Sequence, residues 1–285
     1  MNILVTGARG QLGMSLAERA ASLPKPVPLL LTDLEELDIT DPLAVGQFFL
    51  EHRPGQVINC AAYTAVDRAE TEQESAFRIN ALAPGILGQA CQKYGARLIH
   101  LSTDYVFNGD SDRPYREDDP TDPQGVYGIS KRDGERAVLD AAPESVIIRT
   151  SWLYSEYGHN FVKTMLKLGQ EKDELRVVND QFGSPTYAGD LALAILNILA
   201  EGARFPRGIF HYANQGVTTW HGLAEAAIQA AGLPCRVIPI PTSEFPTPTR
   251  RPAYSVLDTS RLHLLLRQGI PAWQDSLRHC IRQLQ

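Results

Sequence analysis

The chain has 285 residues, of which 44% are hydrophobic, and its 27 basic and 33 acidic side chains give a net charge of −6. That hydrophobic fraction supports a substantial core and excludes a disordered chain. The acidic balance argues against a nucleic-acid-binding protein, which normally carries a basic surplus. Apolar stretches end before the roughly 18 residues that a membrane span needs, so no membrane association is expected.

The N-terminal sequence MNILVTGARG has neither a charged leader nor a cleavage-site pattern, so no secretory signal is expected. The four cysteines are widely spaced, and they form neither a CxxC pair nor a dense disulfide framework. They are Cys60, Cys91, Cys235 and Cys280. We therefore expect buried free thiols and a cytoplasmic protein.

Short apolar runs in the first half predict five strands, at 2–6, 27–32, 56–60, 97–102 and 145–150. Helical spacing between them predicts helices at 11–22, 42–51, 73–94 and 127–141. Strands that are almost wholly apolar are typical of a parallel sheet covered by helices on both faces. The alternation predicts a doubly wound, Rossmann-type α/β domain over residues 1–150.

The second half is less regular. Helices are predicted at 160–171, 189–201, 220–231 and 271–283, and short strands at 175–178, 209–213 and 236–239. We expect residues 151–285 to form mainly a smaller mixed lobe that binds substrate, with a segment at about 187–201 returning to the first domain. From residue 250 onward, six arginines and two acids give the tail a charge of +4. Of these arginines, Arg250 or Arg251 is expected to face an anionic ligand.

Three glycines, Gly7, Gly10 and Gly13, form GARGQLG between the first predicted strand and the first predicted helix. Free backbone N–H groups and the helix dipole make such a junction suitable for a phosphate. Glycine permits the tight turn and the close approach of a pyrophosphate. The position of the motif at the first strand–helix junction, more than its spacing, predicts dinucleotide binding.

Asp33 follows the second predicted strand, about 20 residues beyond the glycines, where an acid can hold a ribose hydroxyl. This position favours NADH. Arg9 lies inside the glycine-rich turn and is an alternative partner for the 2′-phosphate of NADPH, so both cofactors stay open.

Tyr127 and Lys131 lie four residues apart in YGISK, which places both on one face of a predicted helix. A nearby ammonium favours the phenolate and should lower the pKa of the tyrosine. Such a tyrosine can exchange a proton with a carbonyl or alcohol oxygen. Lys131 can also reach a nicotinamide ribose hydroxyl. The pair predicts acid–base chemistry next to the dinucleotide.

Thr103 and Asp104 come directly after Ser102, at the end of the strand predicted at 97–102. Ligands of doubly wound sheets bind at the carboxyl ends of the strands. Thr103 is expected to hydrogen-bond a substrate carbonyl oxygen, and Asp104 to accept from a sugar hydroxyl. No HExxH, paired histidine ligands or GxSxG motif is present, so the sequence predicts neither a metal site nor a serine hydrolase.

These residues together resemble the extended short-chain dehydrogenases/reductases, and most closely the dTDP-4-dehydrorhamnose reductase family. The stretches that carry the resemblance span the chain: GQLG (10–13), NCAAYTAVDRAE (59–70), STDYVFNG (102–109), VYGISK (126–131), RTSWLY (149–154), NFVKTML (160–166), NDQFGSPT (179–186) and TPTRRP (247–252). The resemblance implies a reductase that transfers hydride from NADPH or NADH to C4 of dTDP-4-dehydro-β-L-rhamnose, in dTDP-rhamnose biosynthesis.

The resemblance also implies a role for each matching residue. Cofactor contacts are implied for Gly7, Gly10, Gln11, Leu12, Gly13, Asp33, Asp38, Ile39, Ala62, Tyr63, Thr64, Tyr127 and Lys131. Substrate contacts are implied for Thr103, Asp104, Trp152 and Arg250. Tyr127 is the implied proton donor, Lys131 serves both Tyr127 and the ribose, and Thr103 completes the catalytic set.

The chain departs from the family at one point. Some members hold Mg²⁺ at a dimer contact through acidic side chains, where this chain has Ser15, Gly189 beside Asp190, and no acid in 276–285. A Mg²⁺-bridged dimer is therefore not expected, and a monomer or weak homodimer is.

Two other functions stay open. One is another nucleotide-sugar epimerase, dehydratase or reductase of the same broad family. Tyr105, where dehydratases carry an acid, disfavours the dehydratase. The other is a non-catalytic regulatory subunit that binds NADP, which the presence of Thr103, Tyr127 and Lys131 disfavours.

Overall fold

The computed structural model describes residues 2–200, 205–266 and 268–285. Six parallel strands form its main sheet, in the order β10-β5-β4-β3-β1-β2. They are β1 (Ile3–Thr6), β2 (Leu29–Thr32), β3 (Gln56–Asn59), β4 (Arg97–Thr103), β5 (Val146–Thr150) and β10 (Gly208–Tyr212). The order reverses between β1 and β3, which is where doubly wound sheets open a crevice for ligands. The predicted α/β fold is confirmed.

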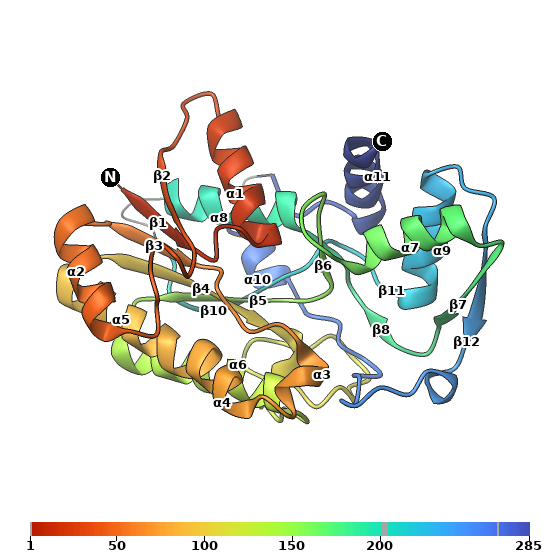
Figure 1. The fold of residues 1–285 in the computed structure, drawn as a ribbon, viewed down its shortest axis with the longest axis horizontal. Helices are drawn as coiled ribbons and strands as arrows, with labels where there is room; N and C mark the ends of the chain where they lie inside the picture. Colours follow the sequence, from red (N-terminus) through yellow and green to blue (C-terminus); the bar gives the residue numbers. More distant parts are fainter. Residues whose placement is uncertain (1, 201–204, 267) are drawn as a thin grey trace.

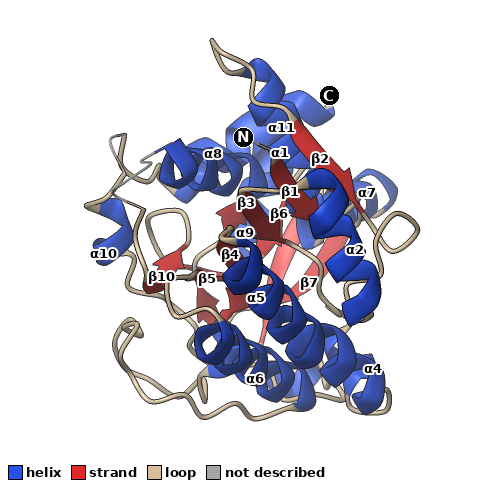
Figure 2. Cartoon of the chain, turned by 90° about the vertical axis from the view of Figure 1, so that its left-hand side faces the viewer, coloured by secondary structure: helices blue, strands red, loops and turns tan. Residues whose placement is uncertain are grey.

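Helices cover both faces of this sheet (Figure 2). On one face lie α1 (Gln11–Ser22) and α8 (Ala188–Ala200), and on the other α2 (Pro42–His52), α5 (Ala83–Tyr94) and α6 (Val126–Ala141). The strands alternate between the two cores: Ile3 and Val5 pack in the core of α1 and α8, whereas Leu4 packs in that of α2 and α5. Burial on both faces explains the apolar strands.

The helical region predicted at 73–94 is confirmed as one continuous stretch of three consecutive segments. They are α4 (Gln73–Phe77), a π-helical turn at Arg78–Leu82 and α5. The turn buries Asn80, whose side-chain amide bonds to the backbone of Tyr63 rather than to the helix. A short helix α3 (Val66–Ala69) precedes them; it is too short to show a helical period in the sequence.

Three segments of the second half belong to the layers of the first. β10 pairs with β5 at the edge of the main sheet, α8 packs along α1, and the short helix α10 (Ser260–His263), which no sequence pattern predicted, packs against β10. The prediction placed this helix at 189–201, and residue 201 lies outside the described residues. The division of the chain at residue 150 stays a prediction.

The other elements of the second half gather beside the sheet, on the right in Figure 1. The helices are α7 (Phe161–Glu171), α9 (Trp220–Ala230) and α11 (Trp273–Leu284), and the parallel pair is β7 (Glu174–Val178) with β12 (Arg236–Ile240). Short pieces that no sequence pattern predicted complete them: β6 (Leu153–Tyr154), β8 (Phe182–Gly183), β9 (Thr186–Tyr187) and β11 (Thr218–Thr219). Among the described residues, no helix has the length and apolarity needed to cross a bilayer.

Candidate active site

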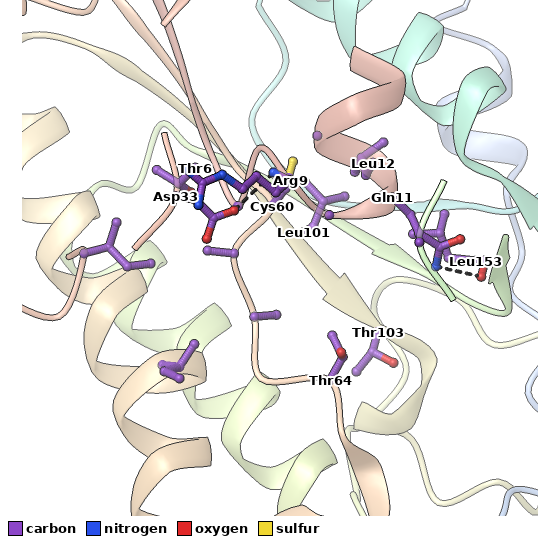
Figure 3. A pocket seen from close by; sticks show the side chains of 18 of the residues that line it. Thr6, Arg9, Gln11, Leu12, Asp33, Cys60, Thr64, Leu101, Thr103 and Leu153 are labelled. Atoms are coloured by element: carbon purple, nitrogen blue, oxygen red, sulfur yellow. Dashed lines mark hydrogen bonds between the residues drawn. The ribbon is translucent and has the colours of Figure 1, made fainter. Parts of the chain in front are cut away.

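A cavity of about 720 Å³ runs along the carboxyl edge of the main sheet. Its lining takes residues from the ends of five successive strands, as the view in Figure 3 illustrates. They are Thr6 of β1, Asp33 after β2, Cys60 after β3, Thr103 of β4 and Thr150 of β5. The register brings these ends level, because Thr6 pairs with Thr32 and Thr103 pairs with Thr150. One cavity therefore reaches both predicted halves of the site.

The glycine-rich turn closes one side of the cavity. A Cβ at Gly7, which has φ +65°, would lie 2.7 Å from the backbone nitrogen of Ala61. A Cβ at Gly13 would lie 2.5 Å from the Gly7 carbonyl oxygen. Helix α1 starts after Gly10 with neither a side-chain cap nor an acid in its first turn. Its first N–H groups are thus left for an anion, and the turn fits the pyrophosphate of a dinucleotide.

The Gln11 side chain does not face the turn. Its Nε2 lies 3.5 Å from the Leu153 carbonyl oxygen, and its Oε1 accepts from Ser155 (3.0 Å) and Asn160 (2.9 Å) (Figure 3). The start of α1 is thereby tied to the second half of the chain. The backbone N–H of Gln11, and not its side chain, is therefore the group that can bind a phosphate.

Asp33, Asp38 and Ile39, which the resemblance assigns to the cofactor, are among the lining residues of the cavity. The Asp38 carboxylate accepts from the backbone N–H (2.9 Å) and the hydroxyl (2.7 Å) of Thr40, and these bonds lower its pKa. Asp38 therefore fixes its own turn, whereas Asp33 stands at the rim beside Arg9 (Figure 3).

The loop after β3 lines the middle of the cavity with Ala62 and Thr64. Tyr63 between them points elsewhere, because its hydroxyl donates to Glu72 at 2.6 Å. Asn80 holds this loop: its Oδ1 accepts from the Tyr63 N–H at 2.8 Å and its Nδ2 donates to the Tyr63 carbonyl at 3.0 Å. Sequence analysis missed Asn80, although an amide inside an otherwise apolar helical run is a usable signal.

Thr103 and Tyr127 meet at the far end of the cavity. The Thr103 hydroxyl donates to Asp104 at 2.9 Å. Burial of the phenol outweighs the opposing effect of the nearby Thr103 hydroxyl and raises the pKa of Tyr127 to about 12. Asp104 itself is buried and does not line the cavity; burial raises the pKa of its carboxyl to about 6.

Lys131 lines the cavity one helical turn after Tyr127, and only 2% of its surface is exposed. Its ammonium donates to the Leu101 carbonyl oxygen at 2.6 Å. Burial lowers the pKa of Lys131 to about 8, although the Glu135 carboxylate opposes this shift. The expectation that Lys131 lowers the pKa of Tyr127 is wrong for the protein alone, because the desolvation of the phenol dominates.

Trp152 stands outside the cavity lining, stacked on Trp220 with ring centroids 3.7 Å apart. Its φ of +49° is rare for a residue with a side chain. Gly183 packs against the ring, where a Cβ would approach within 2.5 Å. The indole is thus held rigidly at a strained backbone position, as functional residues often are.

The two loop arginines are engaged in ion pairs. Arg250 contacts Asp110 at 2.6 Å on the surface, and Arg251 contacts Asp67 at 2.6 Å in a more buried position. One buried guanidinium nitrogen of Arg251, Nη1, has no hydrogen-bond partner. Neither arginine is among the residues that line the cavity: Arg250 forms an exposed ion pair, and Arg251 has one buried donor without a partner.

A buried ion pair lies next to the end of the cavity that contains Thr103. Arg149 donates to Glu135 through Nε (2.8 Å) and Nη2 (2.7 Å), and both side chains are at most 4% exposed. Glu135 also accepts from Ser102, the residue before Thr103, at 2.5 Å. It follows Lys131 by one turn of α6. Sequence analysis did not single out this pair.

All four cysteines are free thiols, with Cys60 at the cavity and the others buried. Within the ranges that the structure describes, no three His, Cys, Asp or Glu side chains gather as a metal site would require. Ser15 donates to the Gln11 carbonyl at 2.9 Å, and Asp190 accepts from Ser276 and Asn214.

Comparison with known proteins agrees with this geometry. The family model described as the RmlD substrate binding domain matches residues 1–285. A dTDP-4-dehydrorhamnose reductase of Streptomyces griseus is 46% identical, over 96% of this chain and 91% of that protein. The crystal structure of such a reductase from Clostridium acetobutylicum has a TM-score of 0.93 at 42% identity, covering 100% of this chain and 99% of that one. That of the Bacillus anthracis reductase, in complex with NADP, has a TM-score of 0.93 at 39% identity, covering 99% of each chain. This chain belongs to the family of the RmlD substrate binding domain.

Proposed function

We propose that this protein reduces the 4-keto group of dTDP-4-dehydro-β-L-rhamnose with NADPH or NADH and so forms dTDP-β-L-rhamnose. One observation carries the proposal. A single cavity joins the uncapped start of α1, suited to a pyrophosphate, to Thr103, Tyr127 and Lys131, suited to a carbonyl oxygen. Relatives that carry this reductase name match nearly the whole chain.

The cofactor would lie along the carboxyl edge of the sheet. The N–H groups of Gln11, Leu12 and Gly13 would bind its pyrophosphate, and Asp33 would bind the adenosine ribose. Ala62 and Thr64 would border its middle. When bound, the reduced nicotinamide supplies the hydride that carbon C4 of the sugar receives.

The protein supplies the proton that the C4 oxygen requires. With a pKa of about 12, Tyr127 carries its proton at neutral pH, as a donor must. The Thr103 hydroxyl, at the same end of the cavity, turns its single hydrogen from Asp104 to the carbonyl oxygen and so orients the substrate. Lys131, held by the Leu101 carbonyl, contributes a positive charge that stabilises the phenolate left behind, and it donates to the nicotinamide ribose.

The second half of the chain would hold the dTDP-sugar. The indole of Trp152 offers a rigid apolar face, and Asp104 binds a sugar hydroxyl directly or fixes Thr103 through their bond at 2.9 Å. Of the two loop arginines, Arg251 is the better partner for the diphosphate because its Nη1 is unpaired. Arg250 would first have to leave Asp110.

The test is NAD(P)H oxidation by purified protein with dTDP-4-keto-L-rhamnose, made in situ by the upstream enzymes. We expect the absorbance at ~340 nm to fall with formation of dTDP-rhamnose, and the Tyr127→Phe variant to lose about 10²- to 10⁴-fold in kcat. Cofactor affinity of the variant should stay within about twofold of wild type. Absence of oxidation by a folded protein would refute the proposal, and full activity of Tyr127→Phe would remove Tyr127 from its role.

We further propose a cytoplasmic monomer or weak homodimer that works without a Mg²⁺-bridged contact. Ser15 supports this proposal because its hydroxyl bonds to its own helix, at Gln11. Sedimentation in the presence of Mg²⁺ and of a chelator tests the assembly. A stable dimer that the chelator dissociates would contradict it.

A further inference from the structure

The rim of the cavity at the end of β2 is a fixed group of acidic side chains. Asp33 accepts from the Arg9 backbone N–H at 3.1 Å and from the Leu34 N–H at 2.9 Å. Glu36 accepts from the Asp33 N–H at 2.8 Å. These bonds hold the Asp33 carboxylate at the cavity, next to the glycine-rich turn (Figure 3).

The one basic side chain at this rim is already paired. The Arg9 guanidinium lies 2.9 Å from Glu35 and 2.6 Å from Glu36. Three carboxylates, of Asp33, Glu35 and Glu36, thus surround a single cation, which leaves a local charge of about −2 at neutral pH. Among the described residues that line the cavity, the other basic side chains are Lys131, at the reacting end, and His159, beside Gly158.

The two nicotinamide cofactors differ at one position, the 2′ oxygen of the adenosine ribose. In NADH a hydroxyl there can donate to the Asp33 carboxylate. In NADPH a phosphate stands there, which carries up to two negative charges and needs a cation. Arg9 can bind this 2′-phosphate only by breaking its ion pairs with Glu35 and Glu36. The three carboxylates at the rim also repel the phosphate.

We infer that this chain selects NADH over NADPH, and that Glu35 and Glu36 set the preference by occupying Arg9. The inference rests on the proposed function only in placing the adenosine ribose at Asp33. A relative from Bacillus anthracis is described in complex with NADP. The fold therefore admits that cofactor, and side chains at this rim must decide the choice.

The experiment measures dissociation constants of NADH and NADPH by calorimetry, without sugar, so that turnover is not needed. For the wild-type protein in ~20 mM salt, we expect NADH to bind about tenfold more tightly, and the gap to narrow as salt screens the rim. Glu35→Gln combined with Glu36→Gln should lower the NADPH constant about tenfold and leave that of NADH within about twofold. Glu225→Gln, a change of another exposed glutamate, on α9, is the matched control and should alter neither dissociation constant.

A wild-type protein that binds NADPH as tightly as NADH overturns the inference. So does a double variant whose NADPH affinity is unchanged. Glu35→Gln alone keeps the test valid if the double variant folds poorly, because the Glu35 side chain is 77% exposed. The failure of this inference can be distinguished from the failure of the proposed function. NADH-selective binding with no sugar reduction refutes only the proposed function. Sugar reduction with equal use of both cofactors refutes only the selectivity for NADH.

Discussion

Replacing Glu135 by Met while Arg149 remains is expected to lower the free energy of unfolding by about 3–5 kcal/mol. The reason lies in the burial of the pair, because Glu135 accepts two hydrogen bonds from a guanidinium that is 2% exposed. Without Glu135, that charge stays in the interior with only weak contacts: the Glu117 carbonyl oxygen at 3.4 Å, His211 Nε2 at 3.5 Å and the Phe107 ring, whose centroid is 5.0 Å away. Since a domain is stable by only about 5–15 kcal/mol, the loss is a large share of the total.

The assay is urea unfolding followed by circular dichroism, with free energies extrapolated to water. The matched control is Glu144→Met, which removes an acid from an exposed pair with Arg207 and should cost less than about 1 kcal/mol. Adding Arg149→Met to Glu135→Met should recover much of the loss, because no buried charge then remains unpaired. A Glu135→Met variant no less stable than the control, or a double variant less stable than the single one, would refute the reasoning.

Two further predictions concern Asp104 and the glycine-rich turn. Burial raises the pKa of Asp104 to about 6, above its unfolded value of about 3.9, so its stabilising contribution is complete below pH ~4 and is lost as pH rises through ~6. The unfolding free energy of wild type minus that of Asp104→Asn should therefore fall by up to about 3 kcal/mol between pH 4 and 7 in urea titrations, and a constant difference would contradict the shift. Gly13→Ala places a Cβ 2.5 Å from the Ala8 Cα and should abolish NADH binding in calorimetry. The control Gly46→Ala, whose Cβ has nothing within 4 Å, should bind NADH normally and be more stable by up to about 1 kcal/mol. If the two variants bind NADH equally, the glycine-rich turn tolerates a side chain.

The sequence predicts elements best where the pattern is long and local. The strand β1 and the helix α1 follow from a short apolar run and a helical period, and the structure places them at Ile3–Thr6 and Gln11–Ser22. The spacing of Tyr127 and Lys131 likewise predicts a shared helix face, and both line the cavity. These features depend on neighbours within one turn, so the sequence alone contains them.

Features that depend on distant neighbours could not be predicted. β10 pairs with β5, about 60 residues earlier, and no local pattern distinguishes that edge strand from a strand of the second lobe. Glu135 and Arg149 are 14 residues apart, on α6 and β5, and they read as separate surface charges until the fold buries them together. The partner of Arg250 is equally distant in sequence, since Asp110 lies 140 positions away, and the charge pattern of the tail contains no information on it.

The expected pKa of Tyr127 failed for a physical reason. Spacing places an ammonium near the phenol, and a charge alone would lower the pKa. The spacing does not show how much of the phenol the fold removes from water. It also does not show that the Leu101 carbonyl oxygen accepts a hydrogen bond from Lys131. Desolvation is a property of the whole packed site, and a short motif contains no information on it.

The most direct test of the central claim is the fate of one deuterium. NADH labelled at C4 of the nicotinamide, on the face that the enzyme uses, is incubated with the protein and dTDP-4-keto-L-rhamnose, and the product is examined by proton NMR and mass spectrometry. The proposed reaction predicts one deuterium, at C4 of dTDP-β-L-rhamnose, and at least about 100-fold less labelled product when Tyr127→Phe is used for the same time. A product without deuterium, or with deuterium at another carbon, would contradict hydride transfer to C4.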